Sequence, residues 1–321
     1  MKQTLFNENC PSYAGISTFQ NIPFQAELDG MDYAVVGIPY DCSSVMRADA
    51  RFGPNDMRSE PSFKSGIGWS SDLQIQVGDD FCGTDLGEAP IKFGYLAPSL
   101  RIAEEYTAKI INKGAISIAV GGGQIITLAE LRAVKKKYGK VALVHFDSNR
   151  DVRNFGAEYD DATAVRKVIE EELIDPAHSI QLGIRGGYYS KEECDYAKDL
   201  GMKVLTASQM HEMTRSEIMS AIVKTVGDMP CFISVDMSFV DPAFAPGVTT
   251  PVSGGFASVD IRQIIRYIGV ELDVKAMDVV DFTPSYDPGH ITAQLVESIM
   301  RDSVAAFAKR KANKNGGKNN A

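Results

Sequence analysis

The sequence has little histidine and no arrangement of cysteines that is typical of a metal site. Its 321 residues include four histidines and five cysteines. The cysteines are scattered, odd in number and without zinc-finger spacing, so we expect free thiols in a reducing compartment. Neither a structural zinc ion nor a disulfide framework is therefore expected to support the fold.

The sequence also lacks an excess of positive charge and any long apolar run. Its formal net charge is −9, which argues against a general nucleic-acid binder, because neutralising phosphates requires a basic surface. No stretch approaches the roughly 18 consecutive apolar residues of a membrane-spanning helix, and the first residues, MKQTLFNENC, lack the apolar run of a signal peptide. We therefore expect a cytoplasmic protein whose partners are neither nucleic acids nor membranes.

The sequence does contain short β-branched runs that alternate with longer amphipathic stretches. Strands are predicted at residues 33–40, 116–120, 141–147, 180–184, 203–206, 231–237 and 275–282. Helices are predicted at residues 128–138, 164–173, 190–200, 217–226, 259–267 and 293–309. This alternation predicts an α/β fold with three layers, α/β/α, around a mainly parallel central sheet.

The sequence also predicts where two helices begin and how the chain divides into domains. Capping boxes at Ser190 and Thr214 predict the starts of two helices, since a glutamate follows each of them by three residues. Residues 1–308 are expected to form a single domain. The lysine-, glycine- and asparagine-rich residues 309–321 are expected to form a flexible basic tail.

Polar residues follow several of the predicted strands. Gln124 comes after one strand, Asp147 and Asp151 after the next, and Asp236 ends a third. Ligands of parallel sheets bind at the carboxyl ends of the strands, so these residues predict the position of a site. The glycines at 121–123 are interpreted as a tight turn, because the Gly-Lys-Ser/Thr of a phosphate-binding loop does not follow them.

Five segments together resemble the ureohydrolase family of arginases and agmatinases, in particular its agmatinase-like branch. They are GIPYDCSSVMRADARFGPNDMRS (37–59), GGGQ (121–124), HFDSNRD (145–151), SVDMSFVDPAFAPGVTTPVSGG (234–255) and VVDFTPSYDPGHITA (279–293). The resemblance covers about residues 33–307, and its motifs occur in the family's order. It implies an arginase-like fold and hydrolysis of a guanidine or amidine C–N bond.

The resemblance also implies how the family's two metal ions, manganese or nickel, would be held by four aspartates and two histidines. Three of these six positions keep an aspartate: Asp147, Asp151 and Asp236. The other three are Gln124 and Asn149 at the histidine positions and Ser238 at an aspartate position. Neutral amides and a hydroxyl are weak ligands, so we expect no dinuclear metal centre in this chain.

Other positions of the family's site differ as well. Asp161 aligns with the proton-carrying histidine, and Asp281 aligns with the glutamate that receives the substrate guanidinium, so Asp281 is the expected substrate-binding residue. The remaining aspartates are interpreted as a metal-free cluster paired with arginine and backbone N–H groups, with a single magnesium-like ion as the alternative. Arg47 and Arg150 are the expected neighbouring cations, and His145 is interpreted as a core residue.

Three functions stay open at this point. The first is a non-catalytic subunit of a hetero-oligomeric ureohydrolase, similar to the metal-free chain of a two-component enzyme such as metformin hydrolase. A homologous catalytic subunit would carry the manganese or nickel, in a trimer or hexamer typical of the family. The second is an active agmatinase-like amidinohydrolase with a remodelled site, and the third is a sensor of a guanidinium compound.

Overall fold

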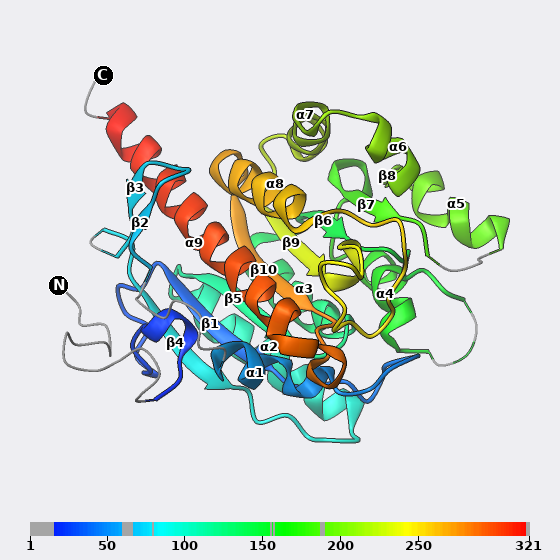
Figure 1. Cartoon of the computed structure of the whole chain (residues 1–321), viewed down its shortest axis with the longest axis horizontal. Helices are drawn as coiled ribbons and strands as arrows, with labels where there is room; N and C mark the ends of the chain where they lie inside the picture. The colour runs from blue at the N-terminus through cyan, green and yellow to red at the C-terminus, as the bar shows by residue number, and fades with distance from the viewer. Residues whose placement is uncertain are drawn as a thin grey trace.

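The computed structural model describes residues 16–59, 67–78, 80–154, 156, 158–186 and 190–318, with side chains up to 315. A central sheet lies between two layers of helices, which confirms the predicted three-layer α/β/α architecture (Figure 1). The eight strands of this sheet are all parallel and lie in the order β4-β1-β5-β10-β9-β6-β7-β8. Their bounds are β1 Tyr33–Ile38, β4 Gly83–Glu88, β5 Ile116–Gly121, β6 Ala142–Phe146, β7 Ile180–Ile184, β8 Lys203–Thr206, β9 Cys231–Asp236 and β10 Val274–Val280.

The strands form because successive apolar side chains are buried on opposite faces of the sheet. In β1, Val35 packs into one hydrophobic cluster and Val36 into the other. In β6, Val144 and Leu143 divide in the same way. Parallel strands covered on both faces are expected to be almost continuously apolar, and this is why the sequence predicted them.

The helices form two separate layers. One layer holds α1 Gly53–Ser59, α6 Ala207–Glu212, α7 Arg215–Val226, α8 Ser258–Glu271 and α9 Ile291–Lys318. The other layer holds α2 Leu96–Asn112, α3 Ile126–Tyr138, α4 Ala164–Glu170 and α5 Lys191–Asp199. Figure 1 shows α8 and α9 side by side over one face of the sheet. A small antiparallel pair, β2 Trp69–Ser70 and β3 Ile75–Gln76, lies apart from the sheet.

Two local predictions are confirmed by the hydrogen bonds at helix starts. Ser190 and Glu193 form a reciprocal capping box before α5, and Thr214 and Glu217 form one before α7. Each box satisfies N–H groups that have no partner within the helix.

The last helix is longer than predicted, since α9 continues to Lys318. Arg310 donates to the carbonyl oxygen of Val270 at 3.0 Å, and Lys311 lies 2.6 Å from a carboxylate oxygen of Asp32. These contacts hold the first part of the predicted tail against the domain. Residues 319–321 lie outside the described residues, so the flexibility of the tail's end stays a prediction.

Two further expectations concern membrane-spanning helices and the state of the cysteines. None of the helices within them is both long and apolar enough to cross a bilayer. Four of the five cysteines, Cys42, Cys82, Cys194 and Cys231, are free thiols in the structure, and Cys10 lies outside the described part of the chain.

Candidate functional site

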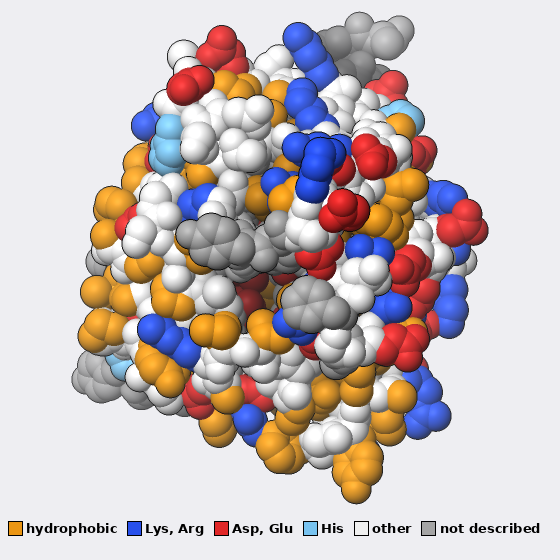
Figure 2. All heavy atoms as spheres, turned by 90° about the vertical axis from the view of Figure 1, so that its right-hand side faces the viewer, with side chains coloured by type: hydrophobic (Ala, Val, Ile, Leu, Met, Phe, Trp, Pro, Cys, Tyr) orange, Lys and Arg blue, Asp and Glu red, His pale blue; other side chains and the backbone are white. Residues whose placement is uncertain are grey.

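The site lies at the carboxyl ends of four strands that are consecutive in the sheet: β5, β10, β9 and β6. Gln124 follows β5, Asp281 follows β10, Asp236 ends β9 and Asp147 follows β6. The fold therefore brings together residues that are far apart in the sequence, as expected for a parallel sheet. Gln124, Asp236 and Asp281 line a cavity of about 240 Å³, together with Asn149, Asp151 and Asp161. Figure 2 shows acidic side chains inside a hollow of this face.

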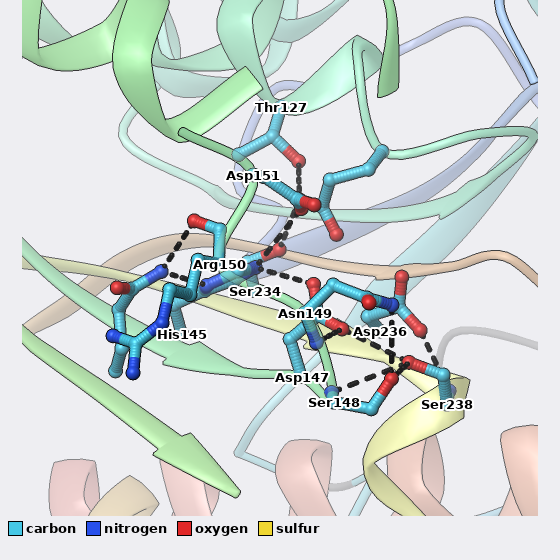
Figure 3. A network of polar contacts seen from close by, with 12 residues as sticks. Thr127, His145, Asp147, Ser148, Asn149, Arg150, Asp151, Ser234, Asp236 and Ser238 are labelled. Atoms are coloured by element: carbon cyan, nitrogen blue, oxygen red, sulfur yellow. Dashed lines mark hydrogen bonds and ion pairs between the residues drawn. The ribbon is translucent and has the colours of Figure 1, made fainter. Parts of the chain in front are cut away.

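Asp147 is buried and accepts hydrogen bonds from the residues that replace two of the expected ligands. Its Oδ1 receives the backbone N–H of Asn149 at 2.7 Å and the hydroxyl of Ser238 at 2.9 Å (Figure 3). Burial opposes ionisation of the carboxyl group, but contact with His145 and the N–H of Asn149 keeps its pKa below the ordinary value. Asp147 is thus an anion stabilised by protein donors.

Ser238 joins this contact to a wider network. Its Oγ accepts hydrogen bonds from the N–H of Ser148 at 3.3 Å and from the hydroxyl of Ser148 at 2.9 Å. The side-chain amide of Asn149 donates to the hydroxyl of Ser148 at 2.9 Å. The serine and the asparagine are therefore both engaged with protein atoms (Figure 3).

Gln124, at the other histidine position, is buried and also held by neighbours. Its Nε2 donates to the hydroxyl oxygens of Thr127 at 2.8 Å and Ser234 at 3.0 Å. Thr127 in turn donates to Asp278 at 2.5 Å, so its oxygen is an acceptor toward Gln124. These contacts fix which end of the amide is the nitrogen, and the oxygen Oε1 has no donor among the described residues.

Asp151 is the second aspartate of the loop after β6, and its backbone is strained. Its φ of 52° lies in the left-handed region, which is uncommon for a residue other than glycine. Burial raises the pKa of Asp151 well above the ordinary value, and the negative charge of Asp147 raises it further. Asp147 is therefore the ionised member of this pair of carboxyl groups, and Asp151 is the member that favours its protonated form.

His145 contributes to this cluster, although the sequence interpretation placed it in the core. Its Nε2 lies 3.3 Å from Oδ2 of Asp147 and 3.9 Å from Oδ2 of Asp151 (Figure 3). The three residues form the one group of three metal-type ligands within 4.8 Å of one another that the described residues contain. The core interpretation was correct about burial but missed that the ring faces the site.

The contacts of Gln181 assign the protonated nitrogen of His145. Gln181 Nε2 donates to the carbonyl oxygen of Arg150 at 2.8 Å, which fixes the orientation of the amide. The same nitrogen lies 3.2 Å from Nδ1 of His145, so Nδ1 is an acceptor. The ring proton is therefore on Nε2, the nitrogen that faces Asp147. A nitrogen that carries a proton has no lone pair for a metal ion.

Asp236 and Asp281 form a second pair of carboxyl groups on the other side of the cavity. Asp236 accepts the N–H of Ser238 at 2.6 Å, and Asp281 accepts the hydroxyl of Thr249 at 2.5 Å. Burial raises the pKa of Asp281 to about 6, and burial with repulsion from Asp147 raises that of Asp236 well above its ordinary value. Asp281, with a φ of 62°, lines the cavity, and its role in substrate binding stays a prediction.

Asp161 also lines the cavity, in the place that the resemblance gives to the family's proton carrier. Its Oδ1 accepts the hydroxyl of Ser43 at 2.9 Å and the N–H of Ile125 at 3.0 Å. Burial raises the pKa of Asp161 to about 8, and the charge of Asp281 adds to this shift.

The expected arginine partners do not neutralise these carboxylates. Arg150 donates to the carbonyl oxygen of Cys194 at 3.3 Å. Arg47 lies over the ring of Tyr286, 4.3 Å from its centroid, and donates to the carbonyl oxygen of Val248. Arg47 and Arg150 turn toward carbonyl and aromatic groups, whereas the positive charge of Arg185 interacts with Asp147 and Asp236. The hydrogen-bond partners of the aspartates are hydroxyl groups and backbone N–H groups, and His145 lies beside Asp147.

The donor set does not fit two divalent ions. Gln124 can offer just a neutral amide oxygen in place of an imidazole, the amide nitrogen of Asn149 bonds Ser148, and the Ser238 hydroxyl is already used on Asp147. A single ion between His145, Asp147 and Asp151 would meet the proton on Nε2. Gln181 would have to turn away from Arg150 before that proton could move to Nδ1.

Comparison with known proteins places this geometry in a family. The arginase family model matches residues 31–305. Proclavaminate amidinohydrolase of Streptomyces clavuligerus is 34% identical over 93% of this chain and 95% of its own length. The chain belongs to the arginase family. Guanidinobutyrase of Pseudomonas aeruginosa is 32% identical to this arginase-family chain, over 96% of it and 97% of the relative.

The solved structures agree with the fold described above. The structure of the amidinohydrolase from Streptomyces clavuligerus superposes with a TM-score of 0.87, covering 94% of this chain and 99% of that one. An agmatinase of Neisseria meningitidis is 36% identical over 82% of both chains. The predicted family and fold are thus confirmed: the chain is an arginase-fold member with agmatinase-like and guanidinobutyrase-like relatives.

Proposed function

We propose that this chain is a non-catalytic, metal-site-deficient subunit of a hetero-oligomeric ureohydrolase. The observation that carries the proposal is the hydrogen bond from Ser238 to Asp147, at a position where the resemblance expects a metal-binding aspartate. Hydrolysis in this family needs a metal pair that lowers the pKa of a bound water. A hydroxyl and two amides in place of three ligands leave this chain without the means to hold such a pair.

The partner in this proposal is a homologous catalytic subunit that carries manganese or nickel. The complex would hydrolyse the C–N bond of a guanidine or biguanide, as metformin hydrolase does, in a trimer or hexamer. Agmatinase and guanidinobutyrase activities among the relatives support a guanidine-type substrate. We propose the cytoplasm as its compartment, and neither a nucleic acid nor a membrane as a partner.

A subunit role requires a large interface, on the order of 2,000 Å² or more for an obligate contact. The chain exposes several large hydrophobic side chains, among them Met46, Phe93 and Tyr95. Aromatic residues and methionine are enriched in protein interfaces, so these residues support the proposal as candidate contacts.

The test is reconstitution with a family member that has all six ligand positions. We expect the mixed oligomer to be more active than the partner alone, and this chain alone to be inactive. Asp236→Ala in this chain should leave the activity of the complex largely intact, while the equivalent change in the partner should abolish it. Loss of activity from Asp236→Ala here, with assembly unchanged by mass measurement, would contradict the proposal.

An active amidinohydrolase with a remodelled site is the second candidate. It is favoured by the names of the relatives, which cover nearly the whole chain, and by the cavity that persists at the strand ends. Its test is turnover of agmatine and 4-guanidinobutyrate by the purified chain alone. Turnover that disappears in the Asp281→Asn variant would establish this candidate and remove the need for a partner.

A further inference from the structure

A second cavity lies at the amino ends of β5 and β10, at the opposite end of these strands from the aspartate site. Its volume is about 320 Å³, and it is lined by the starts of both strands, the end of α3 and the second half of α9. Figure 1 shows that α9 runs from the carboxyl ends of the strands toward their amino ends. None of the residues that line the aspartate cavity lines this one.

Part of the lining of this second cavity is apolar. It includes Leu272 and Val274 at the start of β10, Phe307 of α9 and the aromatic rings of Phe81 and Tyr138. Tyr138 is half-buried at the end of α3, so part of its side chain stays open to the cavity. An apolar lining of this kind favours a ligand with a hydrocarbon part, because binding removes apolar surface from water.

The rest of the lining carries a surplus of positive charge. Four cationic side chains stand opposite two aspartates: Lys275, Arg310, Lys311 and Lys314, with Asp32 and Asp273. The C-terminal ends of α3 and α8 also lie here, and each contributes about half a negative charge. A surplus of about one positive charge therefore remains, in a chain whose net charge is −9.

The two aspartates are already paired with lysines. Lys311 lies 2.6 Å from a carboxylate oxygen of Asp32, and Lys275 lies 2.9 Å from one of Asp273. The ammonium group of Lys314 lies 3.8 Å from Asp273, which is beyond hydrogen-bond distance. Within the described part of the chain, the surplus charge thus belongs to Arg310 and Lys314.

Arg310 is held in place while one edge of its guanidinium group stays unused. Its Nη1 donates to the carbonyl oxygens of Val270 and Glu271 at the end of α8. Neither Nε nor Nη2 has an acceptor among the described residues, and no carboxylate among them forms an ion pair with Arg310. A fixed guanidinium with a free N–H edge is suited to a carboxylate ligand.

A further lysine crowds the same region. The ammonium groups of Lys137 and Lys275 each lie 5.2 Å from the centroid of the Tyr138 ring. Burial lowers the pKa of Lys137, and the positive charge of Lys275 lowers it further. A bound anion would reduce this repulsion between the two lysines.

We propose that this second cavity binds an organic carboxylate with a compact apolar body. The carboxylate would pair with Arg310 and the neighbouring Lys275 and Lys314, and the hydrocarbon part would lie against Tyr138 and the apolar lining. A bare inorganic anion would use the charges but leave the apolar lining exposed. The site is separate from the aspartate cavity, and its occupation does not depend on the proposed subunit role.

The experiment is calorimetric titration of the full chain with benzoate, acetate, inorganic phosphate and benzylammonium. We expect saturable binding of one benzoate per chain, about tenfold tighter than acetate or phosphate, and no binding of benzylammonium. Arg310→Gln should weaken benzoate binding about tenfold or more. Because this change also removes the contacts with α8, Lys314→Gln is the second variant, and it should weaken benzoate binding about threefold without a loss of packing.

Lys191→Gln is the matched control, because it makes the same charge change at an exposed ion pair with Asp195 on α5. It should bind benzoate like the unchanged chain, and circular dichroism checks that each variant keeps its fold. No saturable binding of benzoate, equal binding of benzylammonium, or unchanged affinity in both the Arg310 and the Lys314 variants would overturn the proposal. Phosphate binding tighter than benzoate would overturn the assignment of a ligand with an apolar body.

Discussion

Ser238 donates its hydroxyl hydrogen to Oδ1 of Asp147 at 2.9 Å, so a neutral side chain fills the place of an expected metal ligand. This hydrogen bond changes how the charge of Asp147 is stabilised. A carboxylate that receives a serine hydroxyl and the N–H of Asn149 on one oxygen is stabilised without a metal ion. Ser238 therefore stands at the position of an expected ligand and also supplies a hydrogen-bond donor to the Asp147 carboxylate.

Ser238→Ala should destabilise the chain by about 1–2 kcal/mol, because it removes the donor of a buried charged acceptor. Ser303→Ala is a suitable control: Ser303 is equally buried, but its hydroxyl bonds the carbonyl of Ile299 in its own helix. Urea denaturation of the two variants measures the difference. An equal loss in both would show that the contact with Asp147 adds nothing to stability.

Asp161→Asn should stabilise the chain, and more at about pH 8 than at about pH 5. The folded pKa of Asp161 is raised to about 8 by burial and by Asp281, whereas an unfolded aspartate titrates near about 4. The stability that the protonated group contributes is complete below about pH 4 and is lost as the pH rises through the folded value. Asparagine does not ionise, so the Asp161→Asn variant does not lose stability in this way as the pH rises.

The expected gain is on the order of a few kcal/mol near pH 8 and much smaller near pH 5. Denaturation curves at the two pH values measure it directly. A gain that is independent of pH would mean that Asp161 is ionised in the folded chain throughout this range.

His145 should exist in the folded chain with its proton on Nε2. The amide of Gln181, which is fixed by the carbonyl oxygen of Arg150, makes Nδ1 an acceptor. Nitrogen-15 NMR distinguishes the two tautomers, and a His145→Asn variant assigns the signal among four histidines. Observation of the Nδ1-protonated form would leave Nε2 available as a ligand and would reopen the single-ion alternative.

The sequence was sufficient for seven of the eight sheet strands, because buried parallel strands are almost continuously apolar. It did not predict β4, GTDLGE, the last strand at one edge of the sheet, which pairs with β1 and forms an isolated bridge between Asp85 and Phe24. Asp85 lies in this strand and is buried, paired with Arg58 at 2.8 Å. A charged residue in a strand is buried only when a distant partner compensates it, and sequence patterns do not reveal that partner.

For the site as well, the sequence predicted which residues come together but not the direction of their side chains. The resemblance correctly placed Gln124, Asp147, Asn149, Asp151, Asp236, Ser238, Asp161 and Asp281 around one strand-end region. It did not reveal the direction of flexible side chains, so Arg150 was wrongly expected to neutralise the aspartates. The ring of His145 faces the cluster with Nε2, because Gln181 on the neighbouring strand β7 contacts its other nitrogen, Nδ1.

Metal analysis of the purified chain decides whether its strand-end site can hold the two metal ions of the family. The purified chain would be exposed to manganese or nickel, desalted, and analysed for metal beside a Gln124→His, Asn149→His and Ser238→Asp triple variant. We expect well under one equivalent of metal in the unchanged chain and a higher content in the triple variant, which restores the ligands that the family resemblance expects. Two tightly held ions in the unchanged chain would show that it is not deficient in its metal site.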